Sequence, residues 1–213
     1  MHASLCVCAL VPRLQTRTRL VLVIHRYEDR KPTNTGRLAA SSLVNSEIVV
    51  RGHRPTDDAA PESPLVFPAG AQPVLLYPAD DAVPLAQFAD AAAPVVLVVP
   101  DGNWRQAGKM RKRVPGLAAV PCVSLPAGAP TAYRLRFEPQ KGGLATLEAI
   151  ARAFGVLEGP AVEEALLVPF RAMVERTLWA RGEIDESAVR DGLPPGAMRH
   201  DPTSGLARPR RTC

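Results

Sequence analysis

The feature that most constrains the fold is a series of five short apolar runs, each about as long as one strand. They occupy residues 20–25, 47–52, 73–78, 94–100 and 120–125. Several are apolar at every position, and such a strand needs cover on both faces. Helical patterns lie between and after the runs, at 36–43, within 79–92, and at 104–114, 144–156 and 161–181. This alternation predicts an α/β fold with a mostly parallel sheet and helices on both faces.

The remaining segments are predicted to be irregular. Residues 26–35 and 53–72 are expected to be polar loops, and 134–137 a short extended segment. In open parallel sheets, ligands bind at the carboxyl ends of the strands. The polar loops that follow Ile24, Tyr77, Val99 and Leu125 are therefore the expected walls of a binding site.

Composition narrows the class of protein. The 213 residues are 46% hydrophobic, which excludes a wholly disordered chain. The net charge of +5 favours an anionic partner, and arginine, which binds phosphate in a planar and bidentate way, supplies most of it. A GC-rich coding sequence would also raise the arginine, alanine and proline content. No apolar run approaches 18 residues, no signal peptide is evident, and the four cysteines are scattered. We therefore expect a cytoplasmic protein without a membrane partner.

Three groups of residues carry more specific information. They are HRYE at 25–28 followed by KPTNTGRL at 31–38, VPDGNW at 99–104, and YRLR at 133–136 followed by LATLEA at 144–149. In this order they resemble the DTW-domain family of tRNA-uridine aminocarboxypropyltransferases. The resemblance covers residues 6–180. It implies a SPOUT-like α/β fold with a C-terminal knot, and S-adenosylmethionine as co-substrate. It also implies transfer of the 3-amino-3-carboxypropyl group to N3 of a tRNA uridine, with methylthioadenosine as the leaving group.

The resemblance suggests a domain division and shows two departures. An N-terminal arm at 1–18 would precede a catalytic domain at 19–190 and a disordered basic tail at 191–213. Asn103 stands where the family signature has a hydroxyl residue; Asn still caps a helix. Cys6 and Cys8 look like the end of the family's four-cysteine cluster, but two thiolates are too few for structural zinc. Zinc is therefore a possible metal without a complete ligand set.

Asp101 and Trp104 are the candidate catalytic residues. Asp101 follows an apolar strand, and its carboxylate could remove the N3 proton as general base. The alternative is that Asp101 caps the helix that follows. Trp104 offers a face on which a base could stack, or it packs in the core.

The co-substrate is expected to contact the strand-end loops and the donor-rich loop before the first helix. That loop could bind a carboxylate or phosphate at the helix N-terminus, or Thr35 could simply cap the helix. Arg37 could add a bidentate contact to the same anion, or it could lie on a solvated face of the helix. Arg136 is included because the matching family segment lies beside the pocket. The expected contacts are Thr33, Asn34, Thr35, Gly36, Arg37, Leu76, Tyr77, Pro78, Pro100, Gly102, Val123, Leu125, Arg136 and Thr146.

A basic cluster follows the signature. Lys109, Arg111, Lys112 and Arg113 would contact RNA phosphates, or would form an ordinary solvated helix face. His25 is interpreted as a structural residue rather than a ligand. The expected partners are tRNA and S-adenosylmethionine, and no DNA partner is expected.

Two other functions remain open on the sequence. One is the same fold acting as a SPOUT-type RNA methyltransferase, or as an aminocarboxypropyltransferase on ribosomal RNA. The other is an RNA-binding module that has lost catalysis, against which the intact Asp101 argues.

Overall fold

The computed structural model describes residues 3–31, 34–52, 62–135 and 143–199. Its centre is a six-stranded sheet in the order β2-β1-β5-β3-β6-β4, and every pair of neighbours is parallel. The strands are β1 (Arg19–His25), β2 (Ser46–Arg51), β3 (Gln72–Leu76), β4 (Val83–Pro84), β5 (Val95–Asp101) and β6 (Cys122–Ser124). The parallel sheet and its five main strands are confirmed, whereas the two-residue β4 was not predicted.

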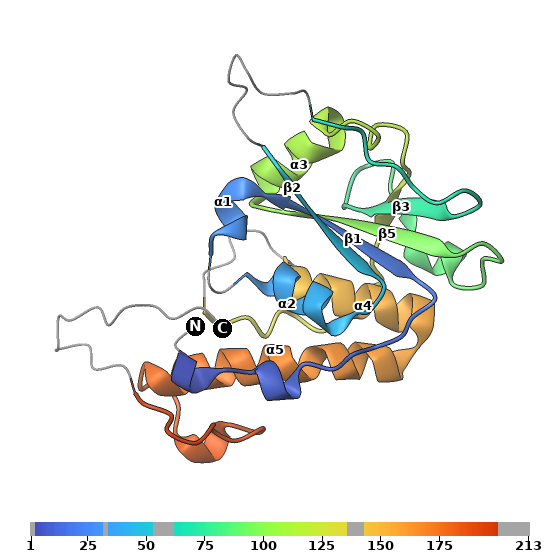
Figure 1. Ribbon diagram of the computed structural model, residues 1–213. Coiled ribbons are helices and arrows are strands. Elements are labelled where there is room, and N and C mark those ends of the chain that lie inside the picture. The colour runs from blue at the N-terminus through green and yellow to red at the C-terminus, as the bar shows by residue number, and fades with distance from the viewer. Residues whose placement is uncertain (1–2, 32–33, 53–61, 136–142, 200–213) are drawn as a thin grey trace.

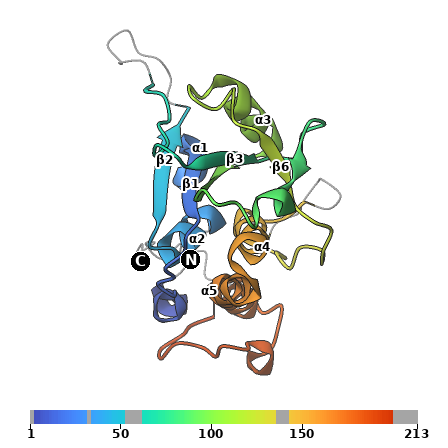
Figure 2. The ribbon, with the colours of Figure 1, turned by 90° about the vertical axis from the view of Figure 1, so that its right-hand side faces the viewer.

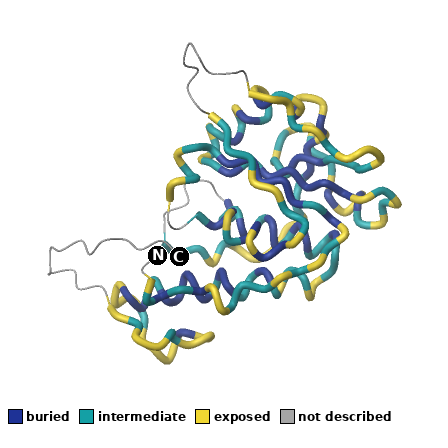
Figure 3. Tube along the Cα trace, viewed as in Figure 1, coloured by how far each residue is buried: buried dark blue, intermediate teal, exposed yellow. Residues whose placement is uncertain are grey.

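The apolar runs form the central strands because both faces of those strands are covered. In β1, Leu20 and Leu22 face one hydrophobic cluster while Val21 and Val23 face another. Residues 95–99 of β5 alternate between the same two clusters. Figure 3 shows these strands as the buried middle of the molecule. A run of aliphatic residues without polar interruption is what a doubly covered strand requires.

The helices form a layer on each side of the sheet. They are α1 (Arg26–Asp29), α2 (Thr35–Ser42), α3 (Trp104–Arg113), α4 (Thr146–Glu158) and α5 (Pro160–Ala180), with 3-10 turns η1 (Ala3–Leu5), η2 (Cys8–Leu10), η3 (Leu85–Phe88) and η4 (Glu186–Ala188). Helix α3 covers one face, and α2 and α4 cover the other with α5 beneath them (Figures 1 and 2). The predicted cover on both faces is confirmed.

A tight turn joins the two long helices. Gly159 separates α4 from α5 with φ of 104°, a left-handed conformation that favours glycine. Pro160 then starts α5, where its missing N–H costs no helical hydrogen bond. The turn stacks α5 on α4 and so places α4, not α5, against the sheet.

Two loop predictions are corrected. Residues 26–29 of the expected polar loop form the short helix α1, because the His25 side chain accepts a hydrogen bond from the Tyr27 backbone and starts the turn. Residues 134 and 135 form a turn rather than an extended segment, and 136–137 lie outside the described residues.

Segments near the first and last described residues pack against α5. Leu5 joins Trp179 and Val189 in a small apolar cluster, and Arg176 donates to the backbone carbonyls of Cys6 and Gly192. Residues 200–213 of the expected tail lie outside the described residues, and the domain division remains a prediction. No helix in the described ranges is long and apolar enough to cross a bilayer.

Candidate active site

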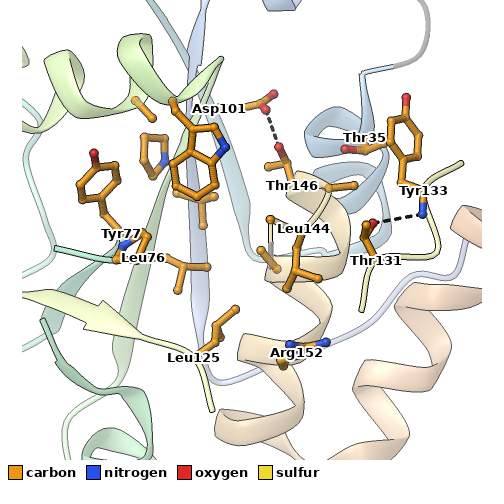
Figure 4. Close-up of a pocket in the computed structure, with 18 of the residues that line it drawn as sticks. Thr35, Leu76, Tyr77, Asp101, Leu125, Thr131, Tyr133, Leu144, Thr146 and Arg152 are labelled. Atoms are coloured by element: carbon orange, nitrogen blue, oxygen red, sulfur yellow. Dashed lines mark hydrogen bonds between the residues drawn. The ribbon is translucent and has the colours of Figure 1, made fainter. Parts of the chain in front are cut away.

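A pocket of about 830 Å³ opens at the carboxyl edge of the sheet. Its walls come from the ends of β3, β5 and β6, the first turns of α4, and the loop that follows β6 (Figure 4). The crossovers from β1 and β5 leave on opposite faces, through α2 and α3 respectively. Adjacent strands whose connections diverge leave a crevice between them, and ligands bind in such crevices.

Asp101 lies in this pocket as the last residue of β5, opposite Ile24 of β1. It is only 5% exposed. The Asn34 side-chain amide donates to its Oδ2 at 2.6 Å, and the Thr146 hydroxyl donates to its Oδ1 at 2.6 Å (Figure 4). Donors from α2 and α4 therefore hold one carboxylate in one orientation at the end of a central strand.

Asn34 is oriented by a second role. Its Oδ1 caps α2 by accepting from the Arg37 backbone N–H at 2.7 Å. With the oxygen used by the cap, the NH₂ group is the one that faces Asp101. Helix capping thus fixes which end of the amide meets the carboxylate.

Gly36 allows α2 to approach Asp101 closely. A Cβ atom at position 36 would lie 2.8 Å from Asp101 Oδ2 and 3.1 Å from both Leu22 methyl carbons. That is closer than real Cβ contacts, so a side chain at this position would push the carboxylate or the helix away.

The alternative role of Asp101 as a helix cap is wrong. Asn103 caps α3: its side chain accepts from the Gln106 backbone, and the Gln106 side chain accepts from the Asn103 backbone. The Asn that departs from the family signature therefore performs the capping expected of it. Asp101 remains oriented toward the pocket and its two donors.

Most of the expected co-substrate contacts line the pocket. These are Asn34, Thr35, Leu76, Tyr77, Pro78, Pro100, Gly102, Val123, Leu125 and Thr146, and Trp104 lines it as well. Trp104 is partly buried and belongs to neither of the two main core clusters, which does not fit the core-packing alternative.

The other expected co-substrate contacts do not line the described pocket or lie outside the described residues. Gly36 sits behind Asp101, and Arg37 forms an ion pair with Asp29 rather than lining the pocket. Thr33 and Arg136 lie outside the described residues. Thr35 does not cap α2, because it is the first helical residue and Asn34 before it is the N-cap. The Thr35 hydroxyl instead accepts from the Leu147 backbone N–H in the first turn of α4.

The basic residues of α3 differ in whether an acidic side chain pairs with them. Arg111 pairs with Asp81 at 2.6 Å, which also raises the pKa of Arg111. Lys109, Lys112 and Arg113 are exposed, and so is Arg105, which was not predicted. Positions 105, 109 and 112 share one side of the helix, because they are spaced by four and three residues.

Several pocket residues were not among the individual contacts expected from the sequence. Those in or beside the loops expected to form the walls are Glu28, Lys31, Ser124 and residues 126–131, and those elsewhere include Tyr133, Leu144 and Arg152. Glu148, 8% exposed, holds that loop: its carboxylate accepts from the Thr131 hydroxyl and the Ala132 backbone, and also from the Ala145 backbone. The Glu in the LATLEA string thereby joins the loop to α4.

His25 lies beside this edge without lining the pocket. Its Nδ1 is 3.2 Å from the Gln106 amide nitrogen. Burial, followed by the charge of Arg26, lowers the pKa of His25, which favours the neutral ring. These contacts agree with the structural interpretation of His25.

The cysteines provide no metal-binding group within the described ranges. The Cys8 backbone N–H donates to Cys6 Sγ at 3.3 Å, and both residues lie on the N-terminal arm. No group of three or more His, Cys, Asp or Glu side chains in the described ranges could hold a metal.

Comparison with known proteins identifies the family. The DTW domain matches residues 1–178, which is most of the chain. The chain belongs to the DTW-domain family. All of the described residues that line the pocket lie within the matched range.

Two curated relatives carry a functional name. The chain is 29% identical over 163 residues to "tRNA-uridine aminocarboxypropyltransferase 2" of Drosophila melanogaster, a match covering 76% of this chain and 65% of that protein. It is 27% identical over 208 residues to "tRNA-uridine aminocarboxypropyltransferase A" of Arabidopsis thaliana, covering 80% of this chain and 76% of that protein. The match thus spans slightly less than two thirds of the fly protein. No solved structure matches the chain significantly.

Proposed function

We propose that this DTW-domain protein transfers the 3-amino-3-carboxypropyl group of S-adenosylmethionine to N3 of a tRNA uridine. The observation that carries the proposal is the buried Asp101 carboxylate, held at the end of β5 by Asn34 and Thr146 and facing a pocket. The names of the two relatives support transfer of an aminocarboxypropyl group to a tRNA uridine.

Asp101 is the proposed general base. Uridine N3 is a poor nucleophile while it carries a proton, so a carboxylate within hydrogen-bond reach would accelerate the reaction by removing it. The co-substrate supplies an electron-poor carbon beside its sulfonium. N3 forms a bond to that carbon, the carbon–sulfur bond breaks with its electron pair going to sulfur, and methylthioadenosine departs. The proton taken by Asp101 then passes to solvent.

The pocket has the chemistry such a co-substrate needs. Its volume of about 830 Å³ is in the range of small-molecule sites. Leu76, Val123, Leu125 and Leu144 supply aliphatic surface for a flat purine, and Tyr77 and Trp104 supply aromatic faces. Asn34, Thr35 and Thr146 supply polar groups at one side. We propose that the strand-end loops hold the co-substrate and that Trp104 stacks on a base.

The tRNA is proposed to run along α3. This helix begins at the pocket, with Trp104 and Ala107 in its wall, and exposes Arg105, Lys109 and Lys112 on one side. Contacts from such cations go to phosphates, so they supply affinity and salt sensitivity rather than sequence choice. Arg111 is already neutralised by Asp81 and is left out of this surface.

Two finer parts of the sequence-based expectation belong to this proposal. The first is a SPOUT-type arrangement with a knotted C-terminal part, with which the all-parallel sheet is compatible. The second is a cytoplasmic location, which the small number of scattered cysteines favours.

An isotope experiment separates this reaction from its alternatives. Unmodified tRNA is incubated with carboxyl-labelled or methyl-labelled S-adenosylmethionine, and label retained on the RNA is counted. Carboxyl label on tRNA is expected, because the carboxyl group travels with the transferred chain. Methyl label on tRNA would instead identify a methyltransferase. No label from either, with tRNA still shifted on a gel, would identify an RNA-binding module; transfer to ribosomal RNA alone would change the substrate.

A further inference from the structure

Arg152 is a cation in the pocket that makes no ion pair with a carboxylate of the described residues. It lies on α4, two turns beyond Thr146, with Ala149 between them on the same pocket-lining side. Its Nη2 donates to the Ala129 backbone carbonyl at 2.7 Å. A guanidinium carries five N–H donors, so one carbonyl leaves donors available for a ligand.

The loop after β6 is shaped around this guanidinium. A Cβ atom at Gly128 would lie 2.8 Å from Arg152 Cζ, so the loop backbone packs directly against the charged group. The same loop is tied to α4 through Glu148 and Thr131. The position of the Arg152 head group is therefore set by a restrained wall on one side.

Arg152 differs from the other cation of the pocket. Of the described residues that line it, Lys31 and Arg152 carry positive charge. Lys31 bonds Glu28 at 2.5 Å, so that pair brings little net charge to the pocket. Arg152 is the cation that an anionic part of a ligand would meet.

The two charged ends of the pocket are separated along α4. Asp101 is bonded to Thr146, and six residues of helix place Arg152 about 9 Å further along the axis. Figure 4 shows Asp101 and Arg152 at opposite ends of the labelled side chains. A ligand with a cationic centre and a carboxylate would therefore align in one direction.

The spacing suits the proposed reaction. A hydrogen bond from base to N3 takes about 2.8 Å, and an attacking pair lies about 3–3.5 Å apart. The three carbon–carbon bonds to the carboxyl group, each about 1.5 Å long, extend the path to at most about 11 Å. This path is comparable to the rise of about 9 Å along α4 between Thr146 and Arg152.

We propose that Arg152 recognises the α-carboxylate of the co-substrate and so orients the aminocarboxypropyl chain for transfer. This inference rests on the proposed function, because it takes S-adenosylmethionine as the ligand. Arg152 is then a specificity-determining residue: it distinguishes ligands with the carboxylate from those without it. A bidentate guanidinium–carboxylate contact is the geometry for which arginine is suited.

Calorimetry with three ligands tests the assignment: S-adenosylmethionine, its decarboxylated analogue and methylthioadenosine. Wild type is expected to bind S-adenosylmethionine about 10- to 100-fold more tightly than the decarboxylated analogue, as for a hydrogen bond to a charged group. Arg152→Gln is expected to bring the two within about 3-fold while methylthioadenosine binding stays unchanged. Arg19→Gln removes the same charge at the opposite edge of the sheet, where Arg19 pairs with Glu47, and should keep the wild-type ratio.

The outcomes separate this inference from the proposed function. A wild type that binds both sulfonium ligands equally overturns the inference, even when an Arg152 variant fails to fold. Equal weakening of all three ligands by Arg152→Gln also overturns it, because that result indicates a structural role. If the ratio collapses in Arg152→Gln but wild type transfers no carboxyl label to tRNA, the inference stands and the proposed reaction fails. If wild type transfers carboxyl label to tRNA but Arg152→Gln keeps the wild-type affinity ratio, the proposed reaction stands and the inference about Arg152 fails.

Discussion

Replacing Asp101 by Asn removes a negative charge while preserving the shape of the side chain. In the wild type, Oδ2 accepts from the Asn34 amide and Oδ1 accepts from the Thr146 hydroxyl. An Asn at this position can still accept from Asn34 through its carbonyl oxygen. Its NH₂ can donate to Thr146, because a hydroxyl also accepts. The hydrogen-bond arrangement therefore survives without the base.

The magnitudes follow from this substitution. Two charge-assisted hydrogen bonds become neutral, which costs about 1–2 kcal/mol of unfolding free energy. For a chain of this size that corresponds to a fall in Tm of about 2–8 °C. Loss of a general base, by contrast, lowers turnover by about 10²- to 10⁴-fold. The catalytic loss should therefore far exceed anything that partial unfolding explains.

Single-turnover transfer of carboxyl label to unmodified tRNA measures the catalytic loss, and thermal unfolding measures the stability. The rate of Asp101→Asn should rise with pH, because hydroxide can remove the N3 proton in place of the carboxylate. Asp90→Asn is the matched control, since Asp90 is exposed in a loop and lines no part of the pocket. It should retain the wild-type rate.

A well-folded Asp101→Asn protein that keeps more than about a third of wild-type turnover would remove Asp101 from the role of base. A rate that is reduced but shows the wild-type pH dependence would also count against it. That result would mean that the carboxylate positions a substrate rather than taking its proton.

Three further predictions concern the surroundings of the site. Gly36→Ala places a Cβ 2.8 Å from Asp101 Oδ2 and should cost about 1–3 kcal/mol of stability together with most of the turnover; wild-type values for both would contradict the close approach. Burial lowers the pKa of His25 below 6.5, so its contribution to stability is full above pH 6.5 and is lost as the pH falls through the folded-state value. Urea unfolding should therefore show that the free energy of unfolding falls more between pH 8 and pH 5 for wild type than for His25→Gln. Equal falls would refute this. Lys109→Gln should reduce the slope of log affinity for tRNA against log salt by about 0.7–0.9, while Arg111→Gln, whose charge Asp81 already neutralises, should change it little; the opposite order would place the RNA elsewhere.

The sheet was predictable because its central strands are buried on both faces. An uninterrupted apolar run such as residues 95–99 is stable only between two apolar layers. The run therefore predicts a buried central strand even when the elements that cover it are not known. The strand order was not predictable, since β5 lies between β1 and β3 only through contacts distant in sequence. Helix α1 was missed because one side-chain cap decides a four-residue helix.

The site was predictable where it consists of strand ends and recognisable strings. Asp101, Asn34 and Thr146 come from three separated strings, and the fold brings them into direct contact. Their mutual hydrogen bonds could not be read from spacing. The alternative that Thr35 caps the helix is wrong for the same reason: Asn and Thr at adjacent positions both favour caps, and tertiary contacts decide between them.

Arg152 and Glu148 were overlooked because an amphipathic helix places charged residues on solvent in most proteins. Here one side of α4 forms part of the pocket wall, an environment that is neither core nor solvent, and the loop that follows β6 packs against it. Glu148 holds that loop through three donors, and Arg152 donates to the loop backbone four residues further along the helix. One helix thus carries the hydroxyl that orients Asp101, the carboxylate that fixes the loop and the cation at the far end of the pocket. A substitution that tilts α4 should therefore disturb the Asp101 carboxylate, the loop and the Arg152 guanidinium together, whereas Arg152→Gln should remove the charge and the hydrogen bond to Ala129 and leave Asp101 and Glu148 in place.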